Sequence, residues 1–380
     1  MNDAQRREAF IERLQQLEGL NNPLYLQLQR VLDTSQTRFG YDVDGKLRIA
    51  LFDAQSYDLE SFERWNEGRF AIQPFRTSLD ADSVAMAGGF RVICVFVNDR
   101  LDQQVVDRLA RSGVELIALR CAGYNNVDLN ACQRHGIQVV RVPAYSPHAV
   151  AEHTIALMLM LNRHLHRAYT RVRAGSFHLD GLTGFDMYGK TMGIVGTGQI
   201  GRCVAEILLG FGCHVLAFDK HVDSELAARA HVEYVPLDDL FSQADIISLH
   251  VPLFPATRYL INAATIRKMK RGVMLINTSR GALVDTRALT AGLKSGQIGS
   301  AGLDVYEEEA GVFFHDLSSE VLTDDVLARL LTFNNVVVTS HQAYLTREAL
   351  DNIARTTLEN VLEFERGKRG KELTHGVLPD

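Results

Sequence analysis

The sequence predicts an α/β protein with two doubly wound parallel-sheet domains. Short apolar runs alternate with helical patterns over most of the chain, which is the β-α-β rhythm of a parallel sheet. One long helical segment interrupts this series, which starts again near Lys190. A chain of 380 residues is long enough for two or three domains. We therefore expect two α/β domains with a cleft between them, an arrangement typical of enzymes.

The composition indicates a soluble protein without nucleic-acid or membrane partners. Hydrophobic residues make up 46% and charged residues 23% of the chain, as in ordinary globular proteins. The formal net charge of −6 argues against the basic surface that nucleic acids require. The most apolar helical run, residues 155–161, is far shorter than the roughly 20 residues that span a bilayer.

The cysteines and the N-terminus favour the cytoplasm. The five cysteines are odd in number and none lies in a C-x-x-C pair, a pattern typical of reduced thiols rather than a disulfide framework. The N-terminus contains no apolar stretch and therefore does not resemble a signal peptide. We expect a cytoplasmic protein that holds no metal ion.

The predicted elements form two series that follow a polar N-terminal part. The first series has strands at residues 47–52, 91–97, 115–119 and 138–142. Helices are predicted at residues 103–111 and, after the first series, at residues 147–167. The second series has strands at residues 191–195, 214–218, 245–249, 273–277, 300–304 and 336–339. The last helix is predicted at residues 346–366.

Residues 1–45 are predicted to be a helical N-terminal extension. Apolar residues recur at helical spacing in two stretches, and Asn22-Pro23 between them is a helix-start signal. The two stripes consist of Phe10, Leu14 and Leu17, and of Leu24, Leu28, Val31 and Leu32. Isolated helices of this length are marginal in water, so the stripes need a surface to pack on. We expect that surface on the first domain or on a neighbouring subunit of a homo-oligomer, a dimer or a tetramer.

A glycine pattern marks the start of the second series. Gly196, Gly198 and Gly201 form a G-x-G-x-x-G that follows an apolar run and opens a helical one. A second predicted strand ends at Asp219, 18 residues beyond Gly201. Strand, turn, helix, strand and acid in this order are the context that the dinucleotide fingerprint requires. We therefore predict a dinucleotide site, the alternative being a glycine-rich turn without a ligand.

The glycines and the acid have separate physical tasks in such a site. Gly196 permits the tight turn, Gly198 lets the backbone approach a pyrophosphate, and Gly201 lets helix and strand pack closely. The helix N-terminus presents its N–H groups and positive dipole end to the phosphates. Asp219 can bind ribose hydroxyls and would repel a 2′-phosphate, which favours NAD over NADP. The two basic residues that follow Asp219 weaken this preference slightly.

Three further segments at strand ends carry groups suited to hydride transfer to a keto acid. That reaction needs a cation for the carboxylate, an acid for the carbonyl oxygen and a group that orients the acid. Arg280 can bind both carboxylate oxygens through its planar guanidinium, and His341 is a candidate acid. Other histidines at strand or helix ends are His148, His153 and His250. Spacing alone cannot choose the orienting carboxylate among Asp304, Glu307, Glu308 and Glu309.

Seven segments together resemble the D-isomer-specific 2-hydroxyacid dehydrogenases, and within that family the bacterial enzymes that interconvert pyruvate and D-lactate. The similarity extends from about residue 47 to about residue 366. The segments are LRCAGYNNVD (119–128), VPAYSP (142–147), the glycine pattern, LHVP (249–252), NTSRG (277–281), DVYEEE (304–309) and VTSHQAY (338–344). The residues before position 47 have no counterpart in the usual family pattern.

The resemblance implies a role for particular residues. Arg280 would bind the substrate, His341 would be the acid, and Glu309 rather than Glu307 or Glu308 would orient it. The other implied substrate-binding residues are Ala122, Gly123, Tyr145 and Tyr344. The implied cofactor-binding residues are Gly196, Gly198, Gln199, Ile200, Gly201, Asp219, Val251, Pro252, Thr257, Thr278 and Asp304.

The resemblance also implies the domain layout and the reaction. A flavodoxin-like substrate domain would comprise residues 46–146 and 345–380, and a Rossmann NAD-binding domain residues 147–344, with the active-site cleft between them. The expected reaction is the reversible, NADH-dependent reduction of pyruvate to D-lactate. One alternative is a bulkier 2-keto acid as substrate. Another is a dinucleotide-sensing corepressor that binds partner peptides, against which the small-acid loop segments argue.

Overall fold

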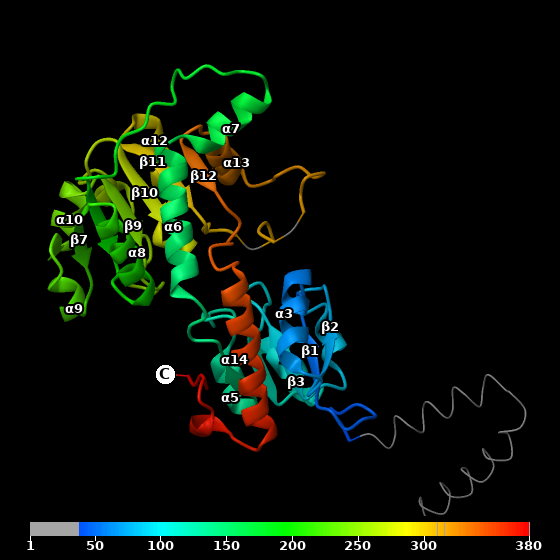
Figure 1. Ribbon diagram of the computed structural model, residues 1–380. Helices are drawn as coiled ribbons and strands as arrows, with labels where there is room; N and C mark the ends of the chain where they lie inside the picture. Colours follow the sequence, from blue (N-terminus) through cyan, green and yellow to red (C-terminus); the bar gives the residue numbers. More distant parts are fainter. Residues whose placement is uncertain (1–37, 310, 315, 380) are drawn as a thin grey trace, which may run out of the picture. The chain divides into compact units, whose positions relative to one another are not determined.

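The computed structural model describes residues 38–309, 311–314 and 316–379 (Figure 1). The two predicted helices of the N-terminal extension lie outside the described residues. The described residues divide into two compact units, one made of residues 38–145 together with those from Leu350 onward, the other of Ser146–Ala349. Within the described part of the chain, no helix is both long enough and apolar enough to cross a membrane.

The first unit contains a five-stranded parallel sheet. Its strands are β1 (Arg48–Leu51), β2 (Ala71–Pro74), β3 (Val92–Val95), β4 (Leu116–Leu119) and β5 (Gln138–Val140). They are ordered β2-β1-β3-β4-β5, and every pairing is parallel. This is the flavodoxin-like strand order. The sheet therefore confirms the fold class predicted for this part of the chain.

Helices cover both faces of this sheet. The helices are α3 (Ser56–Asn66), α4 (Gln103–Arg111), α5 (Leu129–His135) and α14 (Arg347–Glu365). Phe62 of α3 and Leu358 of α14 share one apolar core with Ile49 and Leu51 of β1. The α3 and α4 crossovers lead in opposite directions from β1 and β3, so right-handed connections place these two helices on opposite faces.

The second unit contains a seven-stranded parallel sheet. Its strands are β6 (Thr191–Val195), β7 (His214–Phe218), β8 (Val232–Tyr234), β9 (Ile246–Leu249), β10 (Val273–Asn277), β11 (Ile298–Leu303) and β12 (Val336–Val338). The order β12-β11-β10-β9-β6-β7-β8 is that of a Rossmann sheet with one additional strand. The direction of winding changes between β6 and β9, and ligands of open α/β sheets bind outside the carboxyl ends of the strands at such a point.

Two apolar cores sandwich the second sheet. The helices that line them are α6 (Pro147–Asn162), α8 (Gln199–Gly210), α10 (Leu237–Gln243), α12 (Thr286–Ser295) and α13 (Asp325–Leu331). Ile246 of β9 packs with α6 and α8, while the next residue, Ile247, packs with α10, α12 and α13. Because successive side chains of a strand point to opposite faces, this alternation shows that the unit is doubly wound. Figure 1 shows α6 lying along this sheet.

The structure corrects the prediction of one continuous helix at residues 147–167. The helix α6 ends at Asn162, and a separate helix, α7 (Leu165–Arg173), follows a left-handed residue, His164, at φ 49°. The side-chain amide of Asn162 hydrogen-bonds both the N–H and the carbonyl oxygen of Phe185. No glycine or proline marks this break in the sequence, and local signals therefore do not predict it. The break is instead accompanied by the contact between Asn162 and Phe185, which lie far apart in the sequence.

Candidate active site

The glycine turn after β6 has the shape of a pyrophosphate cradle. Gly196 adopts a left-handed φ of 97°, which an L side chain rarely adopts. A Cβ at Gly201 would overlap the carbonyl oxygen of Gly196, so only glycine lets α8 start this close to β6. A Cβ at Gly198 would meet no atom within 4 Å, which leaves the backbone there open to a ligand. The turn and the N-terminus of α8 thus fit the phosphates of a dinucleotide.

Asp219 lies beside this turn at the end of β7. Its Oδ2 accepts a hydrogen bond of 2.7 Å from the N–H of Thr197, and its Oδ1 accepts one of 3.0 Å from the N–H of His221. Partial burial works against the charged carboxylate, but the backbone bonds from His221 and Thr197 outweigh it and lower the pKa of Asp219. The side chain is therefore an ionised acid held at the turn.

Several of the other predicted cofactor residues already form hydrogen bonds within the protein. Val251 and Pro252 follow β9, the strand beside β6, at the same edge of the sheet as Gly196. Thr257 Oγ1 donates to the carbonyl oxygen of Pro252, and buried Thr278 shares a hydroxyl bond of 2.9 Å with Thr154. Asp304 is fully buried, with both carboxylate oxygens bonded to protein groups.

A histidine–carboxylate pair stands at the carboxyl ends of β11 and β12. His341 Nδ1 lies 3.1 Å from Glu309 Oε1, and the two side chains are 19% and 26% exposed. Glu309 Oε2 also accepts a hydrogen bond of 3.3 Å from the N–H of Tyr306. Since Nδ1 is bonded to the carboxylate, Nε2 is the ring nitrogen that can exchange a proton with a ligand.

Tertiary contacts separate this pair from the other carboxylates and histidines. Glu307 bonds the hydroxyls of Tyr259 and Thr286, and Glu308 is exposed. Desolvation lowers the pKa of His250 to about 3, so this ring is neutral, and its Nε2 bonds the hydroxyl of Ser248. Of the four carboxylates that spacing left open, Glu309 contacts His341 and Asp304 contacts His153.

Arg280 follows β10 and is placed by an unusually close backbone contact. A Cβ at Gly281 would overlap the carbonyl group of Tyr306, so glycine at this position lets the Arg280 turn lie directly against the Tyr306–Glu309 turn. The Arg280 guanidinium donates to the carbonyl oxygen of Ser279 over 2.7 Å. Gly281 was not among the predicted site residues, although a glycine directly after a strand-end arginine is a signal of close approach.

Comparison with known proteins identifies the family. Residues 155–343 match the NAD binding domain of the D-isomer specific 2-hydroxyacid dehydrogenases. The chain is 49% identical over 323 residues to the D-lactate dehydrogenase of Escherichia coli (strain K12), covering 85% of this chain and 98% of that one. The chain belongs to the D-isomer-specific 2-hydroxyacid dehydrogenases. It is an oxidoreductase that depends on a nicotinamide dinucleotide.

Solved structures of other dehydrogenases share the fold. The pyruvate reductase of Chlamydomonas reinhardtii matches with a TM-score of 0.80 at 47% identity, covering 84% of this chain and 96% of that chain. A D-lactate dehydrogenase from Lactobacillus jensenii, solved with NAD⁺, matches with a TM-score of 0.73 at 30% identity, covering 88% of this chain and all 100% of that chain. The predicted fold class is confirmed.

The backbone carbonyl groups of three other predicted substrate-binding residues of the dehydrogenase contact side chains of the same unit. In the first unit, the Arg141 side chain donates to the carbonyl oxygen of Ala122 over 2.9 Å, and Asn352 donates to that of Tyr145 over 2.7 Å. The Cys121 thiol lies 3.2 Å from the carbonyl oxygen of Gly123. In the second unit, Tyr344 is buried. Their roles in substrate binding remain predictions.

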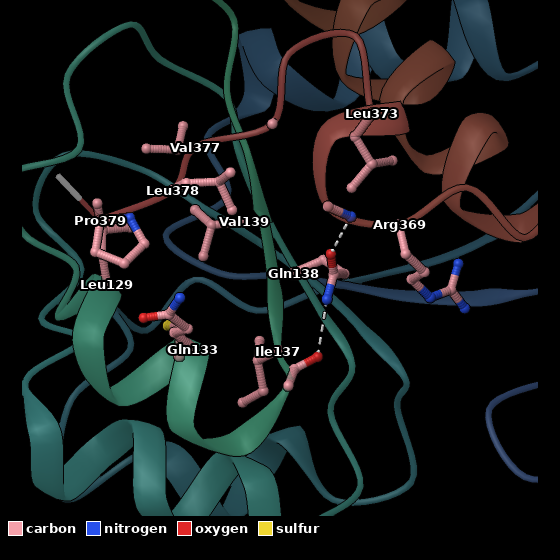
Figure 2. Close-up of a pocket in the computed structure, with 14 residues that line it drawn as sticks. Leu129, Gln133, Ile137, Gln138, Val139, Arg369, Leu373, Val377, Leu378 and Pro379 are labelled. Carbon is pink, nitrogen blue, oxygen red and sulfur yellow. Dashed lines mark hydrogen bonds between the residues drawn. The ribbon is translucent and has the colours of Figure 1, made fainter.

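A pocket in the first unit is lined by none of the predicted site residues. It has a volume of about 180 Å³ and is bounded by α5, β5 and the C-terminal residues up to Pro379 (Figure 2). The Gln138 side chain spans part of it, bonding the carbonyl oxygen of Gly136 and the N–H of Gly370, as the dashed lines in Figure 2 show. The remaining lining is mostly apolar.

Proposed function

We propose that this dehydrogenase reduces pyruvate to D-lactate reversibly, with His341 as the acid, Glu309 as its orienting partner and Arg280 as the carboxylate anchor. The observation that carries the proposal is the 3.1 Å contact between His341 Nδ1 and Glu309 Oε1. The similarity of the chain to a D-lactate dehydrogenase and to a pyruvate reductase supports the choice of substrate.

The proposed chemistry follows from the charges of these groups. When bound, the reduced dinucleotide supplies the two electrons of the reaction. Arg280 holds the substrate carboxylate through its planar fork of N–H donors. His341 gives its Nε2 proton to the carbonyl oxygen as that oxygen becomes negative. Glu309 accepts the Nδ1–H bond, fixes the ring orientation and favours the protonated imidazole. In the reverse direction the neutral ring of His341 removes the hydroxyl proton.

An NADH-oxidation assay over a series of 2-keto acids tests the proposed substrate. We expect the highest kcat/KM with pyruvate and lower values with branched or aromatic 2-keto acids. A branched-chain 2-keto acid that gives a higher kcat/KM than pyruvate would show that the substrate is bulkier. The lack of turnover with every 2-keto acid would contradict the proposed reaction itself.

We further propose that the cofactor is NAD rather than NADP, because Asp219 is ionised beside the turn. The substitution Asp219→Ala is expected to weaken NADH binding by roughly 10- to 100-fold, the range for a lost bond to a charged group. It should also reduce discrimination against NADPH, since the repulsion of a 2′-phosphate is removed. Fluorescence titration with both cofactors measures this, and Asp239→Ala, an exposed acid on α10, is the control. A wild-type preference for NADPH would contradict the assignment.

We also propose that the dehydrogenase is a homo-oligomer that associates through α7 and the segment after it. None of the α7 residues is buried. Leu165, Tyr169 and Val172 are 52%, 66% and 52% exposed and lie on one face of this helix. Phe177 and Leu179, in the segment that follows, are 75% and 78% exposed. Exposed apolar side chains gathered in this way are typical of a surface that a second subunit covers.

The double substitution Tyr169→Lys and Val172→Lys is expected to reduce the assembly to a smaller species. Two charges on the proposed apolar face would have to be desolvated without partners in the interface. Multi-angle light scattering of the wild type and the variant measures the mass. The control is Thr170→Lys, which adds a charge to an exposed residue of the same helix. An unchanged mass in the double variant would place the interface elsewhere.

A further inference from the structure

The turn that carries His341 is held by one buried carboxylate. Asp304 Oδ1 accepts hydrogen bonds from the Thr339 hydroxyl at 2.5 Å and the Gln342 N–H at 2.9 Å, and Oδ2 accepts one from the Ala343 N–H at 2.9 Å. The backbone carbonyl of Asp304 accepts the N–H of His341 at 2.7 Å. Asp304 thus bonds residues on both sides of His341 as well as its backbone.

His341 needs such support because its backbone is strained. Its φ is 53°, in the left-handed region that a residue with a Cβ adopts only at a cost of about 1 kcal/mol or more. A conformation of this kind persists when its surroundings determine it. The position of the imidazole relative to Glu309 therefore depends on the bonds that Asp304 makes to this turn.

A second histidine reaches this carboxylate from α6. His153 Nε2 lies 3.1 Å from the Thr339 hydroxyl oxygen and 3.4 Å from Asp304 Oδ1. The Thr339 hydroxyl has one hydrogen and gives it to Asp304, so toward His153 it can only accept. His153 Nε2 therefore carries a hydrogen and donates to Thr339, with Asp304 Oδ1 close enough to share the bond.

We propose that His153 is a positioning residue for the acid His341, and that it acts through Thr339 and Asp304. The inference rests on the role proposed above for His341. The Nε2–H of His153 holds the Thr339 hydroxyl in the orientation that donates to Asp304. Asp304 in turn keeps the left-handed turn at His341 in the geometry that places its ring beside Glu309. Neither His153 nor Thr339 exchanges a proton with the substrate in this account.

Three substitutions at His153 test the donor that the proposal requires. His153→Ala should lower kcat about 10- to 100-fold, the range for a misplaced catalytic group, while the Kd for NADH stays the same. Gln places a side-chain N–H near the position of Nε2, whereas Asn places one near Nδ1. His153→Gln should therefore recover most of the lost kcat and His153→Asn should not. Equal activity of the Gln and Asn variants would overturn the proposal, because the donor position would then not matter.

Thr339→Val tests the relay independently and keeps the test usable if His153→Ala fails to fold. Val has the shape of Thr without the hydroxyl, so this variant should lose a similar fraction of kcat. The double variant His153→Asn with Thr339→Val should be no slower than Thr339→Val alone, because the losses of residues that act through one contact are not additive. Multiplied losses in the double variant would show that His153 does not act through Thr339.

Two further variants separate failure of this inference from failure of the proposed function. His135→Ala removes another histidine–aspartate contact, 2.7 Å from His135 Nε2 to Asp107 Oδ1 at an exposed site of the first unit, and should leave kcat unchanged. His341→Ala measures the role on which the inference rests. An inactive His341→Ala together with a fully active His153→Ala would refute the inference alone. An active His341→Ala would refute the proposed function and the inference with it.

Discussion

Replacement of His341 with alanine is expected to lower pyruvate turnover about 100- to 10,000-fold, the usual contribution of a positioned general acid. The variant loses the Nε2 donor and leaves Glu309 without its 3.1 Å partner. NADH binding should be unaffected, because the glycine turn and Asp219 belong to β6 and β7 rather than to the His341 turn. A kcat measurement at saturating pyruvate, together with a fluorescence titration of NADH, tests both parts.

Alanine at His341 also relieves little of the backbone strain, since it keeps a Cβ at a φ of 53°. The thermal unfolding curve should therefore show a folded protein, and His135→Ala is the matched control for the loss of one imidazole. Turnover within threefold of the wild type would remove His341 from the role of acid. The neutral ring of His250 could not replace it, because desolvation lowers its pKa to about 3.

Replacement of Arg280 with lysine is expected to lower kcat/KM for pyruvate about 10- to 100-fold, mainly through KM. The charge stays, but an ammonium cannot form the two parallel bonds of a guanidinium to a carboxylate. Loss of a bond to a charged group is worth about 1.5–3 kcal/mol, which corresponds to this range. The close contact of Gly281 with Tyr306 is untouched by the substitution, so the turn itself should be retained.

Steady-state kinetics with pyruvate measure this effect, and Arg287→Lys, at an exposed position of α12, is the matched control. Both variants keep the positive charge. The control should leave KM unchanged, because Arg287 is an exposed residue with no proposed role in binding the substrate. An unchanged KM together with an unchanged kcat in Arg280→Lys would show that another group holds the carboxylate. A fall in kcat with unchanged KM would place the Arg280 contact in the transition state alone.

The sequence by itself determined most of both sheets, because central parallel strands are buried on both faces and read as continuous apolar runs. The predicted strands at residues 191–195, 214–218 and 273–277 agree with β6, β7 and β10 residue for residue. The strands β2 and β8 were not predicted. Both are short edge strands, and their strand conformation depends on pairing with β1 and β7 rather than on a local apolar pattern.

The glycine turn and Asp219 could also be read from the sequence, since each task of the fingerprint depends on local geometry. Only the tertiary structure decided which carboxylate lies beside His341. Glu307, Glu308 and Glu309 are consecutive and chemically alike, and spacing left them open. In the folded chain Glu307 is bonded by Tyr259 and Thr286, Glu308 faces solvent, and Glu309 meets His341. The directions of side chains in an irregular turn are set by partners from distant segments, which no local pattern records.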